Sequence, residues 1–205
     1  MTSPRTRRLA VLASGQGTNL RALLEADRAG ELGGSIVVVL SDRAEAGALA
    51  VAREHGVEAE ALDPGSSKSR LEGEAAWLER LGRADVDTIL LAGFMRILDA
   101  RFLAAYPGRI LNIHPSLLPA FPGTHSIARA LEHGVRVTGC TVHLVDAGVD
   151  EGPILDQTAV AIHADDTLES LTARMHSAEH ALYKRAVHAF LTRPFTLEGR
   201  RVTWQ

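Results

Sequence analysis

The stretch Leu9-Ala10-Val11-Leu12-Ala13-Ser14-Gly15-Gln16-Gly17-Thr18-Asn19-Leu20 decides the fold of this chain. Its first five residues form an apolar run typical of a buried strand, and a helical pattern begins at Leu20. Between them, Gly15 and Gly17 allow backbone N–H groups to approach a ligand closely, and a helix N-terminus favours an anion. Leu20 stands where the dinucleotide-binding fingerprint requires a third glycine. The stretch therefore predicts a strand, a phosphate-binding loop and a helix; a purely structural turn is the alternative.

Short aliphatic runs alternate with amphipathic segments through the first 113 residues. This rhythm is typical of a Rossmann-like, doubly wound, mainly parallel α/β sheet. The predicted strands are Leu9–Ala13, Ile36–Leu40, Val57–Leu62, Thr88–Ala92 and Arg109–Ile113, and the predicted helices are Leu20–Leu24, Ala46–His55, Arg70–Leu81 and Ile97–Ala105.

The pattern changes after residue 120. Two long strand-like runs, Val137–Val145 and Ile154–Ile162, are joined by the loop Asp146–Pro153 and predict an antiparallel C-terminal extension of the sheet. A long helix follows, with Asp165-Asp166-Thr167 as its cap, and Glu198-Gly199 predicts the turn of a small hairpin. The expected segments are the helices Ser126–His133 and Leu168–Leu191, the strands Val137–Val145 and Ile154–Ile162, and the hairpin Phe195–Trp204. We expect one domain over residues 1–205, with a nucleotide-binding half (about 1–120) and a completing half (about 121–205).

The composition favours an enzyme that acts on small molecules. The net charge is −3 and no basic stripe is evident, which argues against nucleic acid. No apolar run reaches the length of a membrane span, and the run after the N-terminal arginines is too short for a signal peptide. Cys140 is the single cysteine, so an intrachain disulfide is impossible and a cytoplasmic location is expected.

The run Asn112-Ile113-His114-Pro115-Ser116-Leu117-Leu118-Pro119 carries the first candidate catalytic residues. Side chains at i and i+2 of a strand share a face, so Asn112 and His114 are expected to project together at the end of an apolar strand. An imidazole carries a proton near neutral pH, and an amide donates to a developing oxyanion, which suits acyl or formyl transfer. The alternative is a strand-end pair that satisfies local backbone groups.

Several segments together are similar to the folate-dependent formyltransferases, which use 10-formyltetrahydrofolate as a one-carbon donor. In chain order, they are Ser14–Asn19, Leu91–Leu98, Asn112–Pro119, Val142–Pro153 and Ala178–Tyr183. The resemblance implies the formyltransferase fold. It also implies transfer of the formyl group from 10-formyltetrahydrofolate, as co-substrate, to the amine of 5-phosphoribosylglycinamide (glycinamide ribonucleotide) in purine biosynthesis, with no metal.

The resemblance also assigns roles to individual residues. It implies catalysis by Asn112, His114 and Asp150, the last selected over its rivals Asp146 and Glu151 by the spacing to Gly152-Pro153. The residues implied for the ribonucleotide are Gly17, Thr18, Asn19, Pro115 and Glu179. Those implied for folate are Arg70, Met95, Arg96, Ile97, Leu98, Asn112, Asp146 and Asp150, with Lys68 left open as an alternative to Arg70.

Other expectations concern the surroundings of this site. Cys140 and His143 are expected to be packing residues, although the family places His143 within reach of the site. No histidine pair has a recognised metal-ligand spacing. His176 and His180 lie four residues apart but are expected to face solvent. A valine at position 17 is expected to fill the space of the phosphate.

Two other functions remain open from the sequence. A formyltetrahydrofolate hydrolase would use the same Asn, His and Asp set, and a non-catalytic nucleotide-binding Rossmann module would explain the glycine loop alone. Small-molecule substrates are expected as partners, and the chain is expected to be a monomer or a homodimer.

Overall fold

The computed structural model describes residues 6–67, 70–71 and 74–205. Within these residues, seven strands form one sheet in the order β3-β2-β1-β4-β5-β6-β7, and two further strands form a hairpin. In chain order the elements are β1 (Arg7–Leu12), α1 (Thr18–Arg28), β2 (Gly34–Ser41), α2 (Gly47–Glu54), β3 (Glu58–Ala61), α3 (Glu74–Arg83), β4 (Thr88–Leu91), α4 (Ala100–Ala105), β5 (Ile110–His114), α5 (Ser126–Glu132), β6 (Val137–Leu144), β7 (Ile154–Ala161), α6 (Leu168–Thr192), β8 (Phe195–Glu198) and β9 (Arg201–Trp204).

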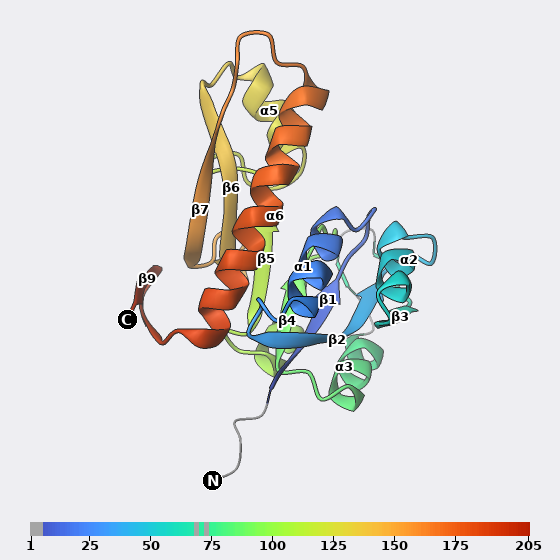
Figure 1. Ribbon diagram of the computed structural model, residues 1–205. Coiled ribbons are helices and arrows are strands. Elements are labelled where there is room, and N and C mark those ends of the chain that lie inside the picture. Colours follow the sequence, from blue (N-terminus) through green and yellow to red (C-terminus); the bar gives the residue numbers. More distant parts are fainter. Residues whose placement is uncertain (1–5, 68–69, 72–73) are drawn as a thin grey trace.

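The predicted doubly wound sheet with an antiparallel extension is confirmed. Strands β3, β2, β1, β4 and β5 pair in parallel, whereas β5–β6 and β6–β7 pair antiparallel. Figure 1 shows β6 and β7 as a long pair that extends beyond the parallel part, with α6 packed along it. Along the sheet, the strands run from β1 toward β3 on one side and from β4 toward β7 on the other, so the chain switches sides between β1 and β4. Open α/β sheets bind ligands at such a switch point, beyond the carboxyl ends of the strands.

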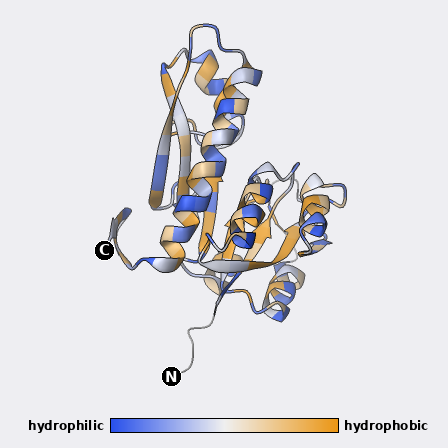
Figure 2. Cartoon of the chain, in the orientation of Figure 1, coloured by the Kyte–Doolittle hydropathy of each residue, from blue (hydrophilic) through white to orange (hydrophobic). Residues whose placement is uncertain are grey.

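Apolar side chains cover both faces of the sheet. Leu9, Val11 and Val39 belong to a buried cluster with residues of α1, α2 and α6, while Leu12 and Val38 belong to a second cluster with α3 and α4. Figure 2 shows the strands of the parallel part as largely hydrophobic and the helices as mixed, which is the pattern of a sheet buried between helical layers.

Helix α6 is fixed to the centre of the sheet by a buried hydroxyl. The side chain of Tyr183 is fully buried, and its O–H lies 3.0 Å from the carbonyl oxygen of Leu91 in β4 and 3.2 Å from that of Leu111 in β5. The predicted cap of this helix is also confirmed, because the Thr167 hydroxyl accepts from the backbone N–H of Ser170 in a capping box.

Two predicted helix starts are wrong. The helix expected at Arg70 is observed from Glu74, and Arg70 instead forms an isolated parallel bridge with Ile97. The helix expected at Ile97 begins at Ala100, because the Asp99 carboxylate accepts from the N–H groups of Arg101 and Phe102 and caps it there. Both differences leave residues 95–98 as an irregular segment at the end of β4.

Candidate active site

A cavity of about 860 Å³ lies at the carboxyl ends of β1, β4 and β5. It is lined by nearly all of the site residues predicted from the sequence, namely Gly17, Thr18, Asn19, Met95, Arg96, Ile97, Leu98, Asn112, His114, Pro115, Asp146, Asp150 and Glu179. Arg70 is the exception. It is exposed and lies beside the cavity, where its bridge to Ile97 holds it next to the 95–98 segment. Lys68, its rival, lies outside the described residues.

Asn112 and Asp150 meet at a third residue, His143. The β5–β6 register places Asn112 directly opposite His143, and Asn112 Nδ2 lies 3.1 Å from His143 Nε2. Nδ1 of His143 lies 2.8 Å from the carbonyl oxygen of Leu144, which can only accept, so Nδ1 carries a hydrogen. In the neutral ring Nε2 then accepts from Asn112, and only the charged ring carries a hydrogen on Nε2 that can be directed to Asp150. The distances from Asp150 Oδ1 are 3.5 Å to Asn112 Nδ2 and 3.6 Å to His143 Nε2.

His114 is buried at the end of β5, with partners at both ring nitrogens. Nδ1 lies 3.3 Å from Asp150 Oδ2, and Nε2 lies 3.0 Å from the carbonyl oxygen of Phe121. The Ser126 hydroxyl lies 3.1 Å from the same Nε2 and donates to the carbonyl of Gly123. Because a carbonyl only accepts, Nε2 is the donor to Phe121. The ring is therefore held between the Asp150 loop and the loop that precedes α5.

The Asp150 carboxylate is aimed into the site by its loop. Asp150 has a left-handed backbone with φ of 57°, and its Oδ2 accepts from the N–H of Gly123 at 2.7 Å. A Cβ at Gly152 would lie 1.8 Å from the carbonyl oxygen of Leu144, so the chain packs tightly there. Among the rival carboxylates, Asp146 lines the cavity and accepts from the N–H of Gly148, whereas Glu151 is exposed and does not line it.

Burial acts in opposite directions on the pKa values of His114 and Asp150. Burial lowers the pKa of His114 below its usual value, and the Asp150 carboxylate and the Phe121 carbonyl oppose this shift. Burial alone would raise the pKa of Asp150, but His143, the Gly123 N–H and the charge of His114 outweigh burial and set this pKa below its usual value. Asp150 is therefore an anion at neutral pH, next to an imidazole that gives up its proton readily.

The glycine loop lies at the N-terminus of α1, as predicted. Gly17 precedes the helix with φ of 83°, and no side chain caps the first turn, so its N–H groups remain available to an anion. The expectation for a valine at position 17 is wrong. A Cβ there would lie 2.8 Å from Cα of Ala48 in α2, and thus points at neighbouring backbone. Gly17 is required by the packing of α1 against α2.

We therefore expect Gly17→Val to destabilise the protein by about 2–4 kcal/mol, because a β-branched residue at positive φ adds to a clash with backbone. Urea unfolding would measure the loss. Gly15→Val is the matched control, since a Cβ at Gly15 meets no atom within 4 Å. Equal stability of the two variants would contradict this account of Gly17.

Glu179 brings a buried carboxylate from α6 to the cavity. Its side chain is 5% exposed, and the amide of Asn19 approaches it at 3.4 Å. Burial raises the pKa of Glu179 to about 7, against a smaller lowering by Asn19. His176 and His180 do not face solvent as expected. Both are half-buried with rings 6.3 Å apart, His176 lines the cavity, and His180 Nε2 is buried without a hydrogen-bond partner among the described residues.

The raised pKa of Glu179 predicts a pH-dependent stability. Protonation favours the folded state, so this contribution is complete below about pH 4.5 and is lost as the pH rises to about 7. We expect Glu179→Gln to remove a change on the order of 1–3 kcal/mol between pH 5 and pH 8. Urea unfolding at both pH values would measure it, with the exposed Glu132→Gln as control. An unchanged difference between the two pH values would contradict the assignment.

The segment 93–98 also lines the active-site cavity, with backbone groups and apolar side chains. The N–H of Met95 donates to the Ser14 hydroxyl at 2.9 Å, which ties this segment to the end of β1. The guanidinium of Arg96 is occupied elsewhere, since it pairs with Asp42 at 2.7 Å and donates to the Ser67 carbonyl. Met95 and Ile97 are exposed large hydrophobic residues. The segment therefore offers free apolar surface, and Arg96 faces the cavity without a free charge.

Two groups that hold the site together were missed from the sequence, and a third was indicated only by the resemblance. His143, expected to pack but placed within reach of the site by the resemblance, contacts Asn112 through Nε2, which lies 3.6 Å from Asp150 Oδ1; its place on the strand that pairs with β5 brings it there. The Ser126 hydroxyl and the Phe121 carbonyl hold His114, and no local pattern marks either one.

No group of three or more histidine, cysteine, aspartate or glutamate side chains among the described residues is placed to hold a metal ion. None of the described helices has both the length and the apolar character needed to cross a bilayer.

The chain is similar to known proteins over most of its length. A family model described as "Formyl transferase" matches residues 7–187. Phosphoribosylglycinamide formyltransferase of Mycobacterium tuberculosis H37Rv is 45% identical over 196 residues, which are 96% of this chain and 90% of that protein. The trifunctional purine biosynthetic protein adenosine-3 of Drosophila melanogaster is 45% identical over 189 residues, 91% of this chain but 14% of that protein. The crystal structure of glycinamide ribonucleotide transformylase 1 from Symbiobacterium toebii superposes with a TM-score of 0.93 at 50% identity, covering 97% of this chain and 94% of that one.

Proposed function

The chain belongs to the formyl transferase family, and on this premise we propose that it transfers a formyl group from 10-formyltetrahydrofolate to the amine of glycinamide ribonucleotide. The products are formylglycinamide ribonucleotide and tetrahydrofolate, in purine biosynthesis. One observation carries the proposal. An amide, an imidazole and a carboxylate meet in a cavity that has an anion-binding helix N-terminus and an apolar wall.

We assign the two substrates to different walls of the cavity. The α1 N-terminus, with Gly17, Thr18 and Asn19, supplies donors for the ribonucleotide phosphate. Pro115 and Glu179 line the same cavity and are assigned to the ribonucleotide as well, since Glu179 lies 3.4 Å from the amide of Asn19. The pterin of the folate suits the apolar wall, where the assigned residues are Met95, Arg96, Ile97, Leu98, Asn112, Asp146 and Asp150. Arg70, exposed beside this wall, is assigned to the folate carboxylates.

The reaction forms one C–N bond and breaks another. Attack of the neutral amine on the formyl carbon produces a tetrahedral oxyanion, and collapse of this intermediate expels the folate nitrogen. The Asn112 amide and the protonated His114 are the donors we assign to the oxyanion. His114 Nε2 already donates to the Phe121 carbonyl, so donation to substrate requires the oxyanion to replace that carbonyl as acceptor.

Asp150 serves two purposes in this mechanism. Its negative charge, 3.3 Å from His114 Nδ1, favours the imidazolium that the oxyanion needs and opposes the effect of burial. As an ionised base, it also accepts a proton from the attacking nitrogen and returns it to the leaving folate nitrogen. The net proton movement is from amine to folate, so the enzyme ends in its starting state.

A single assay separates this function from its alternatives. Incubation with glycinamide ribonucleotide and 10-formyltetrahydrofolate is expected to give formylated ribonucleotide in equal amount to tetrahydrofolate. Formate release without the ribonucleotide would instead indicate a formyltetrahydrofolate hydrolase, and binding without turnover a non-catalytic Rossmann module. We also propose that residues 1–205 act as one domain, in the cytoplasm, as a monomer or homodimer.

A further inference from the structure

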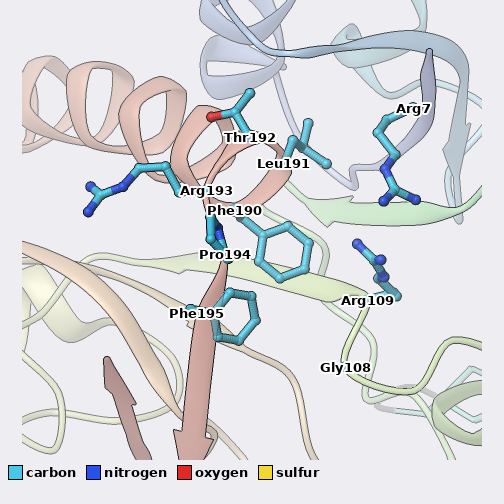
Figure 3. A pocket seen from close by; sticks show the side chains of 9 residues that line it. All are labelled: Arg7, Gly108, Arg109, Phe190, Leu191, Thr192, Arg193, Pro194 and Phe195. Atoms are coloured by element: carbon cyan, nitrogen blue, oxygen red, sulfur yellow. The ribbon is translucent and has the colours of Figure 1, made fainter. Parts of the chain in front are cut away.

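A second cavity, of about 440 Å³, lies at the amino ends of the strands, opposite the candidate active site. It is formed by the start of β1, the turn before β5 and the end of α6. The lining residues are Arg7, Gly108, Arg109, Phe190, Leu191, Thr192, Arg193, Pro194 and Phe195 (Figure 3). The function proposed above uses none of them.

The charged residues that line this cavity are all arginines. Three of its nine lining residues are arginines, and none is Asp or Glu. Within the described part of the chain, the Arg7 and Arg109 side chains have neither an ion pair nor a hydrogen bond. Figure 3 shows the two guanidinium groups pointing toward one another. Two like charges that converge on a cavity repel, and an anion between them would relieve the repulsion.

Aromatic rings form the other wall of the cavity. The guanidinium of Arg109 lies 5.5 Å from the ring centroid of Phe190, and the rings of Phe190 and Phe195 are 5.7 Å apart. Phe195 in turn contacts Trp204 of β9 at 5.4 Å. A planar apolar group could therefore stack beside Phe195 while its charged end faces the arginines.

The surrounding backbone leaves this cavity little freedom to collapse. A Cβ at Gly33 would lie 2.6 Å from Thr192 Cγ2, and a Cβ at Gly34 would lie 3.0 Å from both Cβ and the carbonyl oxygen of Arg7. The glycines thus allow the end of α6 to pack directly on the amino ends of β1 and β2. The arginine-bearing strand and the phenylalanine-bearing helix are held in fixed relation.

We propose that this cavity binds a small aromatic anion, with a phosphate or carboxylate group held between Arg7 and Arg109 and its ring against Phe195. A guanidinium fork suits either anion through paired N–H donors, and a volume of about 440 Å³ lies in the range of small-molecule sites. The site is separate from the formyl-transfer cavity and needs none of its residues.

Titration with phenyl phosphate tests the proposal, followed by calorimetry and by tryptophan fluorescence. Arg7→Gln and Arg109→Gln are each expected to weaken binding about tenfold or more. Arg200→Gln, in the exposed turn between β8 and β9, is the matched control and should bind like wild type. Gly15→Asp, which places a carboxylate at the phosphate loop of the other cavity, should also retain this binding.

Phosphate alone and benzyl alcohol alone are expected to bind more weakly than phenyl phosphate, because each offers half of the recognised chemistry. Melting temperatures of all variants would verify that they fold. Three results would overturn the proposal: no saturable binding at millimolar phenyl phosphate, equal binding by wild type and both arginine variants, or loss of binding in Gly15→Asp alone.

Discussion

Replacing Asp150 with asparagine is expected to lower kcat by on the order of a hundredfold or more, with folate binding retained. The substitution keeps the shape of a side chain that accepts from the Gly123 N–H at 2.7 Å, but removes its charge. His114, whose pKa burial already lowers, would lose the group that opposes this shift. Neither the imidazolium nor the proton acceptor would then be available.

Steady-state kinetics would measure the loss, and calorimetry with a non-reactive folate would verify binding. Asp146→Asn is a control for kcat but not for folate binding, to which Asp146 is assigned: this residue lines the same cavity, but its carboxylate accepts from the Gly148 N–H within its own turn. Glu151→Gln gives a second control, on an exposed neighbour. If Asp150→Asn remained active while either control was inactive, the catalytic carboxylate would be misassigned.

His114→Ala is likewise expected to lower kcat by on the order of a hundredfold or more while ribonucleotide binding is retained, as when an oxyanion donor is removed. The substitution is also expected to lower stability, because His114 is buried and bonded to the Phe121 carbonyl. We expect a loss of about 1–3 kcal/mol, since partners would be left buried without it.

Comparing kcat with urea unfolding separates the two effects of this substitution. His163→Ala, at an exposed histidine in the loop before α6, should alter neither turnover nor stability appreciably. Turnover in His114→Ala near that of the wild type would exclude a catalytic role. A kcat deficit that disappeared under conditions where the variant is fully folded would assign His114 to structure alone.

Local patterns were sufficient for the fold, for the glycine loop and for the pair Asn112 and His114, whereas the other cavity residues were implied by the resemblance to the folate-dependent formyltransferases. The strand-loop-helix unit at residues 9–20 and the alternation after it reflect side-chain periodicity, which is a property of the sequence itself. The 95–98 segment was harder, because the Asp99 cap ends the irregular stretch through side-chain bonds that compete with an otherwise helical pattern.

Interactions between distant segments could not be predicted. His143 joins Asn112 only through the β5–β6 register, across 31 residues, and no local pattern distinguishes it from a buried packing histidine. What a Cβ at Gly17 would meet likewise depends on α2, a separate helix. In both cases the deciding partner lies elsewhere in the chain, so its position follows from the tertiary structure.

The hydroxyl of Tyr183 has a consequence for the order of folding during synthesis. It contacts the carbonyls of Leu91 and Leu111, which precede it by 92 and 72 residues. A nascent chain therefore holds the central strands before the helix that covers them exists, with their apolar face uncovered until residue 183 leaves the ribosome. Closing contacts of such long sequence separation is slow. We therefore expect the interval between translation of β5 and docking of α6 to be the period in which this apolar face is most exposed to aggregation.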